Sequence, residues 1–196
     1  MQEKFSEECN LRNQEMSKVV VFIATSLDGY IASPDGTVDW LFHDADYGYT
    51  EFMASVDAVV MGRKTWEKAR TFEDVPFAGK QVIVFSRSTP NSSEDRIRFV
   101  QGDPSATIAE IRSSVQKDIW LVGGGNSIQQ FIASKLIDEF RIFVHPIILG
   151  EGIPLFHRQS GRTDLIFESS QSFPSGLVEL RYRLHPSNED TQDKEI

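Results

Sequence analysis

The sequence has very little cysteine: Cys9 is the single one among 196 residues, so no disulfide can form within the chain. It also has no apolar run of about 18 residues, the length that a membrane-spanning helix needs. The first residues are polar and of mixed charge, unlike a secretory signal peptide. These absences predict a cytoplasmic protein without a membrane partner.

Positive charge is also scarce. Lys and Arg number 20 against 29 Asp and Glu, which gives a net charge of −9. Nucleic acids and anionic membranes bind basic surfaces, so neither is expected as a partner. The four histidines, His43, His145, His157 and His185, are far apart and lack metal-ligand spacing, so we expect no metal site. An acidic chain that binds an anion must gather its few cations in one place.

Length and composition favour one globular domain. Apolar residues make up 40% of the chain and charged residues 25%, both ordinary values. Residues 1–17 show no clear period and are expected to form a flexible extension, and residues 187–196 a flexible tail. Neither a repeat nor a linker divides residues 18–186, which we expect to be a single domain.

Strand-like and helix-like segments alternate through this domain. Continuous apolar, β-branched runs predict buried strands at 19–25, 57–62, 79–86, 96–100, 118–122 and 139–149. Apolar residues at three-to-four spacing predict helices at 46–56, 64–69, 104–115 and 125–135. The segments "DLIFESSQSF" (164–173) and "LVELRYRL" (177–184) alternate across "PSG" and predict an antiparallel hairpin. Together they predict an α/β domain with a mixed sheet.

Small and cationic residues follow several of the predicted strands. In open α/β sheets, ligands bind beyond the carboxyl ends of the strands. The segments that stand there are "SLDGYIASPDG", "GRKTW", "SRSTPNSS" and "GGGNS", and the cations among them are Arg63, Lys64 and Arg87. Small residues at a helix start suit a phosphate group. The coincidence at one sheet edge favours a nucleotide site.

Each feature also has a structural interpretation. Arg63 and Lys64 can pair with Glu67 one helical turn later, "SRSTPNSS" can be a polar turn, and the three glycines can serve tight packing alone. A Rossmann fingerprint is excluded: Ile128 stands where its last glycine should be, the glycines come late in the chain, and no acid follows the next strand before Glu151.

The combination resembles the dihydrofolate reductase-like superfamily, and most of all the branch that contains the reductase domain of bacterial riboflavin biosynthesis and its stand-alone relatives. The segments that carry this resemblance are "SLDGYIA" with "DW" (26–40), "VVMGRKTWE" (59–67), "VIVFSRS" (82–88), "IWLVGGGNSIQQF" (119–131) and "LIDEFRIFVHPIILGEGIPLF" (136–156). The resemblance implies a three-layer fold with a mixed, mostly parallel sheet of about eight strands. It also implies hydride transfer from NADPH to a pyrimidine or pteridine-like ring, similar to 5-amino-6-(5-phosphoribosylamino)uracil reductase.

The resemblance assigns cofactor-binding residues at four places. At the helix start after the second strand, the pyrophosphate and the 2′-phosphate would be held by Gly62, Arg63, Lys64 and Thr65, and the adenosine end would be flanked by Ser86, Arg87 and Ser88. The pyrophosphate would also be cradled by Gly124, Gly125, Asn126, Ser127 and Ile128. The nicotinamide would be lined by Ala24, Thr25 and Ile31. A cis peptide bond is expected between Gly124 and Gly125. Arg pairs strongly with a phosphate dianion, so NADPH is expected over NADH.

Two acids are candidates for catalysis. Asp46 stands where dihydrofolate reductase carries the carboxylate that assists protonation of the pterin, and a buried carboxylate there could polarise a C=N bond. Asp46 could equally be only the cap of the following helix. Asp28 is the other acid near the expected nicotinamide, and its alternative role is a tight turn before Gly29.

The substrate and the assembly stay open at this point. Riboflavin reductases tend to carry a glutamate where this chain has Gly123, whereas dihydrofolate reductases carry glycine there. Dihydrofolate reduction, or a non-catalytic NADP(H)-binding protein, are the alternatives to a riboflavin-type reductase. The run 140–156 is long and apolar, which suggests that something covers it, and the family often forms homodimers.

Overall fold

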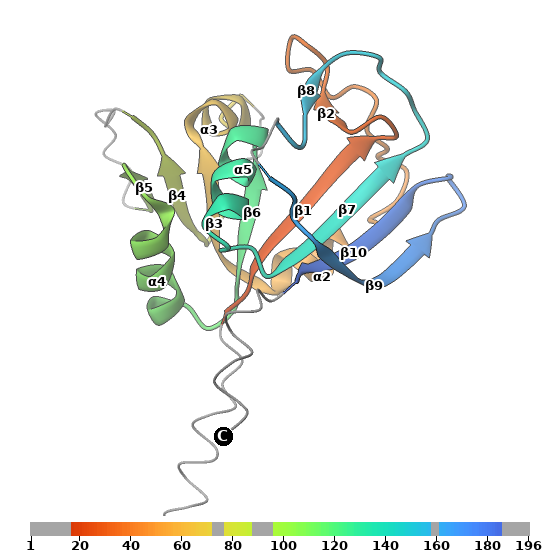
Figure 1. Ribbon diagram of the computed structural model, residues 1–196. Helices are drawn as coiled ribbons and strands as arrows, with labels where there is room; N and C mark the ends of the chain where they lie inside the picture. The colour runs from red at the N-terminus through yellow and green to blue at the C-terminus, as the bar shows by residue number, and fades with distance from the viewer. Residues whose placement is uncertain (1–16, 72–76, 88–95, 158–160, 186–196) are drawn as a thin grey trace, which may run out of the picture.

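The computed structural model describes residues 17–71, 77–87, 96–157 and 161–185. Its main sheet has eight strands in the order β5-β4-β3-β6-β1-β7-β10-β9 (Figure 1). The strands are β1 (Val19–Ser26), β3 (Val56–Gly62), β4 (Gln81–Phe85), β5 (Ile97–Val100), β6 (Asp118–Gly123), β7 (Glu139–His145), β9 (Leu165–Ser172) and β10 (Val178–Leu184). All neighbours pair in parallel except β10, which is antiparallel to both β7 and β9. The predicted fold class, a mixed and mostly parallel sheet closed by an antiparallel hairpin, is confirmed.

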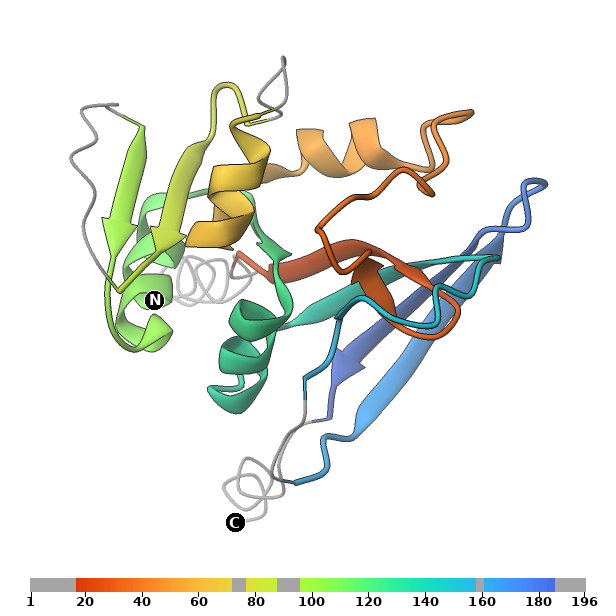
Figure 2. The same cartoon turned by 90° about the horizontal axis from the view of Figure 1, so that it is seen from above.

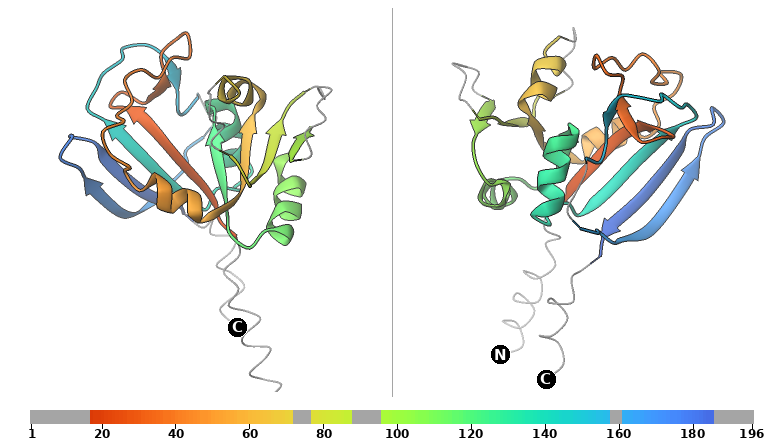
Figure 3. Two further views of the ribbon diagram at one scale, coloured as in Figure 1. Left: turned by 180° about the vertical axis from the view of Figure 1, so that it is seen from behind. Right: turned by 45° about the horizontal axis from the view of Figure 1, so that its top comes forward.

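In the described part of the chain, four helices cover the two faces of this sheet. They are α2 (Tyr49–Ala54), α3 (Arg63–Ala69), α4 (Pro104–Ser114) and α5 (Gly125–Ala133). Figure 2 shows α2 and α3 on one side of the sheet and α4 and α5 on the other, which makes three layers. The β9–β10 hairpin lies at the opposite edge of the sheet from β5 (Figure 3).

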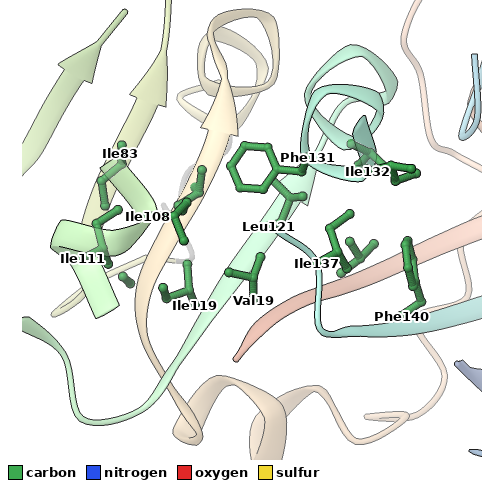
Figure 4. Packing of buried hydrophobic residues seen from close by; sticks show 14 of the residues in the cluster. Val19, Ile83, Ile108, Ile111, Ile119, Leu121, Phe131, Ile132, Ile137 and Phe140 are labelled. Carbon is green, nitrogen blue, oxygen red and sulfur yellow. The ribbon is translucent and has the colours of Figure 1, made fainter. Parts of the chain in front are cut away.

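The middle strands are apolar on both faces because each face carries helices. Val19, Val20 and Val21 of β1 are each 0% exposed. Odd-numbered residues of β1 pack with Ile108, Ile111, Phe131 and Ile132 of α4 and α5 (Figure 4). Even-numbered residues pack instead with Phe52 of α2 and Trp66 of α3. Burying each such side chain stabilises the fold by about 1.5–3 kcal/mol, so the two cores fix the strand ends that matter below.

Some element boundaries differ from the sequence-based predictions for local reasons. Helix α2 begins at Tyr49, not at Asp46, because Tyr47 and Gly48 have left-handed φ values of 51° and 79°. Strand β7 ends at His145 because Pro146 has no amide to donate to the sheet. The predicted extension, apart from residue 17, and the predicted tail 187–196 lie outside the described residues.

A small second sheet was not predicted. It pairs β2 (Tyr30–Ala32) with β8 (Ile153–Pro154) in antiparallel fashion. Gly152 is needed next to it, since a Cβ on this residue would collide with the carbonyl oxygen of Ala32. Each strand is too short to show a periodic pattern in the sequence, and the pair brings the segment after β1 against the segment after β7.

The first part of the long apolar run 140–156 lies in the interior of the sheet. Its strand, β7, pairs with β1 over seven positions on one side and with β10 on the other. The chain itself therefore covers this strand, whereas Ile148, Ile153 and Phe156 farther along the run are 69%, 37% and 44% exposed. The homodimer itself stays a prediction.

Candidate active site

The carboxyl ends of the two central strands separate. Strand β1 pairs with β6 only from Val19 to Val21, opposite residues 119–121. Beyond that point β1 continues along β7 as far as Ser26, and β6 continues along β3 as far as Gly123. Figure 1 shows β1 leaning away from β6 above this point. The next helix along the chain after β1, α2, lies on one face of the sheet, and the helix after β6, α5, lies on the other, which makes this a topological switch point, the usual ligand position in such sheets.

An indole group holds this separation. Trp120 of β6 donates its Nε1–H to the carbonyl oxygen of Phe22 on β1, at 3.1 Å. Phe22 follows the last residue of β1 that pairs with β6. A buried carbonyl without a donor is costly, so the side chain supplies a partner where the backbone ladder ends.

The glycine turn after β6 packs against the start of α3. The amide of Gly124 donates to Thr65 Oγ1 at 2.9 Å. A Cβ placed on Gly62 would lie 2.7 Å from Ser127 Oγ, so these two residues are in close contact. Gly123 has a φ of 113°, a value that favours glycine. Four of the predicted cofactor-binding residues, Gly62, Thr65, Gly124 and Ser127, are thus brought together by two neighbouring strand ends.

The cis peptide bond lies between Gly123 and Gly124. The expectation that it lies between Gly124 and Gly125 was wrong by one residue, because Gly125 is already the first residue of α5. In that helix the amides of Ser127 and Ile128 both donate to the carbonyl of Gly124. Gly125 and Ile128 are buried, whereas Asn126 is exposed.

The predicted cations lie at the same edge of the sheet. Arg63 donates its Nε–H to Glu67 Oε1 at 2.7 Å, an exposed pair one helical turn apart. The structural interpretation of Arg63 is therefore confirmed, although such exposed pairs contribute little to stability. Lys64 and Arg87 are exposed, and Arg87 follows β4, whose Phe85 pairs with Gly62. Ser86 donates its amide to Val100, and Ser88 lies outside the described residues.

The residues predicted to line the nicotinamide lie at the point of divergence. Ala24 and Thr25 belong to the part of β1 beyond its pairing with β6, opposite Phe143 and Val144 of β7. Thr25 is 3% exposed. Ile31 is in β2 and packs against the core on the α5 side. Ala24 and Thr25 therefore belong to the main sheet, and Ile31 belongs to the small second sheet.

Asp46 is exposed and hydrogen-bonded to the first turn of α2. Its Oδ1 accepts from the Thr50 amide at 3.1 Å and from Thr50 Oγ1 at 2.6 Å. Asp46 is therefore not the N-cap residue, which is Gly48, although its side chain accepts from the amide of the second residue of α2. The expected burial is wrong, since Asp46 precedes α2 instead of lying within it. A catalytic role stays a prediction.

Asp28 joins the two loops that follow β1 and β7. Its Oδ1 accepts from the amide of Leu149 at 3.1 Å and its Oδ2 from the amide of Gly150 at 2.8 Å. Hydrogen bonding from Ser26 and from these amides lowers the pKa of the Asp28 carboxyl. The tight turn expected before Gly29 is present, because the Gly29 amide donates to the Ser26 carbonyl at 3.0 Å.

Two residues near this edge were not predicted. His145, at the end of β7 opposite Ser26, is 3% exposed and contacts the rings of Trp40 and Phe42. Its Nε2 accepts from the Phe42 amide at 3.3 Å, which leaves Nδ1–H to donate to Phe143 at 3.2 Å. Burial lowers the pKa of His145. The indole N–H of Trp40 is buried and has no hydrogen-bond partner among the described residues.

Both residues stand in segments that carry the resemblance, "DW" at 39–40 and the run 136–156, but neither was singled out, since a single histidine and a single tryptophan carry no spacing. Within residues 17–71, 77–87, 96–157 and 161–185, no group of three or more His, Cys, Asp or Glu could hold a metal ion. None of the helices in the same ranges is long and apolar enough to cross a membrane.

Comparison with known proteins places the chain in one family. The model of the RibD C-terminal domain matches residues 17–76 and 75–179. Protein YwjB of Bacillus subtilis (strain 168), itself uncharacterized, is 36% identical over 169 residues, which are 84% of this chain and 97% of YwjB.

Solved structures agree with the fold. A protein from Shewanella sp. PV-4, provisionally named a riboflavin biosynthesis protein, has a TM-score of 0.77 and 34% identity; the match covers 86% of this chain and 99% of that one. Dihydrofolate reductase from Enterococcus faecalis, complexed with NADP(H), has a TM-score of 0.65 at 13% identity, covering 87% of this chain and 98% of that one. The second likeness concerns the fold alone.

Proposed function

The chain belongs to the RibD C-terminal domain family, and from that premise we propose that it is an NADPH-dependent reductase of a pyrimidine or pteridine-like ring. The observation that carries the proposal is the divergence of β1 and β6 directly beside the glycine turn. This arrangement offers a position between two layers for a flat ring, and close to it a backbone that a phosphate can approach.

The residues of the turn fit a diphosphate. A side chain on Gly125 would meet the carbonyl of Pro154 and the ring of His157, so this position needs glycine, and Gly62 lies in close contact with Ser127. Thr65 fixes the Gly124 amide. Lys64 and Arg87 would receive the 2′-phosphate, which favours NADPH over NADH because guanidinium and ammonium groups pair strongly with phosphate. Bound NADPH would supply the hydride.

Asp46 is the acid we assign to the substrate ring. Its carboxylate is oriented by Thr50, and a carboxylate held near a ring nitrogen favours the protonated, more electrophilic C=N group. Asp28 has both oxygens occupied by backbone amides, so its proposed role is to position the loop after β1. The name of the Shewanella relative supports a substrate of the riboflavin type.

Assembly and location complete the proposal. Strand β9 is at the edge of the sheet, and its Leu165 and Phe167 are 38% and 56% exposed. A second copy packed over this edge would cover both side chains, so we propose a homodimer, to be checked by light scattering. The single cysteine agrees with a reducing cytoplasm.

The test has two stages. NADPH at about 100 times its Kd should stabilise the fold by about 2.7 kcal/mol, seen as a rise in melting temperature. Candidate pyrimidine, pterin and folate compounds are then screened for loss of the near-ultraviolet absorbance of NADPH. Binding without turnover of any ring would indicate a non-catalytic NADP(H)-binding protein, and no stabilisation by NADPH would refute the proposal altogether.

Asp46→Asn tests the assignment of the acid. Asparagine keeps an oxygen that can accept from Thr50, so helix α2 should remain capped and the melting temperature should not change. Turnover should fall by about tenfold or more, the usual range for loss of a general acid or base. Thr50→Val is the matched control: it keeps the Asp46 carboxylate and removes the Thr50 hydroxyl that donates to it.

A further inference from the structure

His157 packs against the glycine turn from the side opposite to α3. A Cβ on Gly125 would lie 2.6 Å from His157 Nε2 and 2.7 Å from its Cδ2. The same Cβ would lie 2.6 Å from the carbonyl oxygen of Pro154. The edge of the imidazole ring that carries Nε2 is therefore in direct contact with the backbone at the first residue of α5.

The position of His157 is fixed by the small sheet. Strand β8 pairs with β2, and the Leu155 amide that follows it donates to the Gly29 carbonyl at 2.9 Å. Leu155 is 2% exposed and belongs to the core on the α5 side. In Figure 1 the chain after β8 passes beside the first turn of α5, in agreement with the contact at Gly125. His157 is thus held between two anchored elements.

The donors at this place point to a phosphate group. The amides of Ser127 and Ile128 already donate to Gly124, whereas those of Gly125 and Asn126 open the helix and have no intrahelical carbonyl to bind. An imidazole beside them can donate an N–H to a phosphate oxygen in either of its protonation states.

From this contact we infer that His157 is a cofactor-binding residue that donates a hydrogen bond to the diphosphate of NADPH. The inference rests on the proposed function and extends it. It divides the site in two: His157 acts on the diphosphate, which NADPH and NADH share, whereas Arg87 at the end of β4 acts on the 2′-phosphate, which NADH lacks. Loss of His157 should therefore weaken the binding of both cofactors, whereas loss of Arg87 should weaken the binding of NADPH alone.

The experiment measures Kd by titration calorimetry for NADPH, NADH and adenosine 2′-monophosphate. His157→Phe keeps a flat ring of similar size and removes the N–H. It should raise the Kd for NADPH and the Kd for NADH by the same factor, roughly tenfold, as expected for the loss of one charge-assisted hydrogen bond. Adenosine 2′-monophosphate has no diphosphate, so its Kd should not change. His157→Gln keeps an N–H donor and should recover most of the affinity. Arg87→Ala should weaken NADPH and adenosine 2′-monophosphate and spare NADH.

The outcomes separate the possible failures. If wild-type protein binds neither dinucleotide, the proposed function is wrong, and the inference about His157, which rests on it, is wrong as well. If wild-type protein binds NADPH and His157→Phe binds it equally well, the inference is wrong and the function stands. If His157→Phe retains affinity while His157→Gln loses it, the ring serves packing against Gly125 alone, which also overturns the inference. Melting temperatures of the ligand-free variants identify any variant that is not folded.

Discussion

Trp120 Nε1 lies 3.1 Å from the carbonyl oxygen of Phe22 and donates a hydrogen bond to it. The two residues belong to adjacent strands, β6 and β1, and the bond occurs just past the last backbone pair between them, Val21 with Leu121. A side chain of β6 thus satisfies a main-chain acceptor of β1 after the strands have begun to separate. The divergence on which the proposed site depends is stabilised by this bond, because a buried carbonyl without a donor is unfavourable.

Replacement of Trp120 by phenylalanine should therefore lower the free energy of unfolding by more than the loss of side-chain volume alone would. The variant removes the donor to Phe22 and part of a buried ring, and we expect the free energy of unfolding to fall by about 2 kcal/mol or more. Trp66→Phe trims a comparably buried indole in the same core and is the control. Denaturant unfolding compares the two. Equal losses would show that the bond to Phe22 contributes nothing.

Thr65 should matter for the glycine turn through its hydroxyl. Thr65→Val keeps the shape of the side chain but leaves the Gly124 amide without its acceptor. We expect a loss of about 1–3 kcal/mol in stability and a Kd for NADPH that rises by about tenfold, since a disordered turn binds a phosphate less well. Thr65→Ser retains the oxygen and should behave like the wild type in both measurements. A serine variant as weak as the valine variant would assign the effect to the methyl group instead.

Much of the fold could be predicted because its signals are local. The run 19–25 is apolar at every position, and it became β1, buried on both faces. Residues 178–184 alternate, and they became β10 with Leu180 opposite Ile142 of β7. The predicted helix 46–56 began three residues too early, because the left-handed φ values of Tyr47 and Gly48 leave no mark on the apolar pattern. Boundaries therefore failed where backbone conformation, and not side-chain pattern, decides.

The candidate site divides in the same way. The glycine triplet and "GRKTW" stand out as motifs, and the structure brings Gly62 and Gly124 to adjacent strand ends. The contacts of Trp120 and His157 with distant backbone have no counterpart in sequence spacing, because they depend on which strands lie side by side. Such residues can be identified as part of the site only when the strand order is known, and periodicity alone does not provide that order.

Two glycines of the site should tolerate alanine differently. At Gly125 a Cβ would meet the backbone carbonyl of Pro154 at 2.6 Å, and this atom cannot move without disturbing β8. At Gly62 it would meet only Ser127 Oγ at 2.7 Å, which can rotate away, and the φ of −79° at Gly62 suits any residue. We expect Gly125→Ala to lower the free energy of unfolding by about 3 kcal/mol or more, because of overpacking. Gly62→Ala should lower it by less than half of that.

The double variant Gly62→Ala with Ser127→Ala supplies the check. Removing the Ser127 hydroxyl relieves the one close contact, so the double variant should recover the stability that Gly62→Ala loses. Thermal unfolding of the three variants measures this. A double variant less stable than Gly62→Ala would mean that the hydroxyl itself stabilises the turn.

Stability should fall in mild acid because of His145. Burial, and to a lesser degree repulsion from His43, lowers the pKa of His145 from its ordinary value of 6.5. Below that value the unfolded chain binds a proton that the folded chain does not, so folding becomes less favourable. The loss begins as the pH falls through about 6.5 and ends where folded His145 itself becomes protonated. Thermal unfolding between about pH 8 and pH 5, above the range of most carboxyl groups, measures it.

The variant His145→Gln should flatten this pH dependence. Glutamine does not titrate, and its amide can donate to the Phe143 carbonyl or accept from the Phe42 amide, as the neutral imidazole does. Its melting temperature should be lower than that of the wild type near neutral pH, because the edge-on contact with Trp40 and the tilted contact with Phe42 are lost. The difference should narrow as the pH falls. A slope in His145→Gln as steep as in the wild type would assign the acid sensitivity to another group.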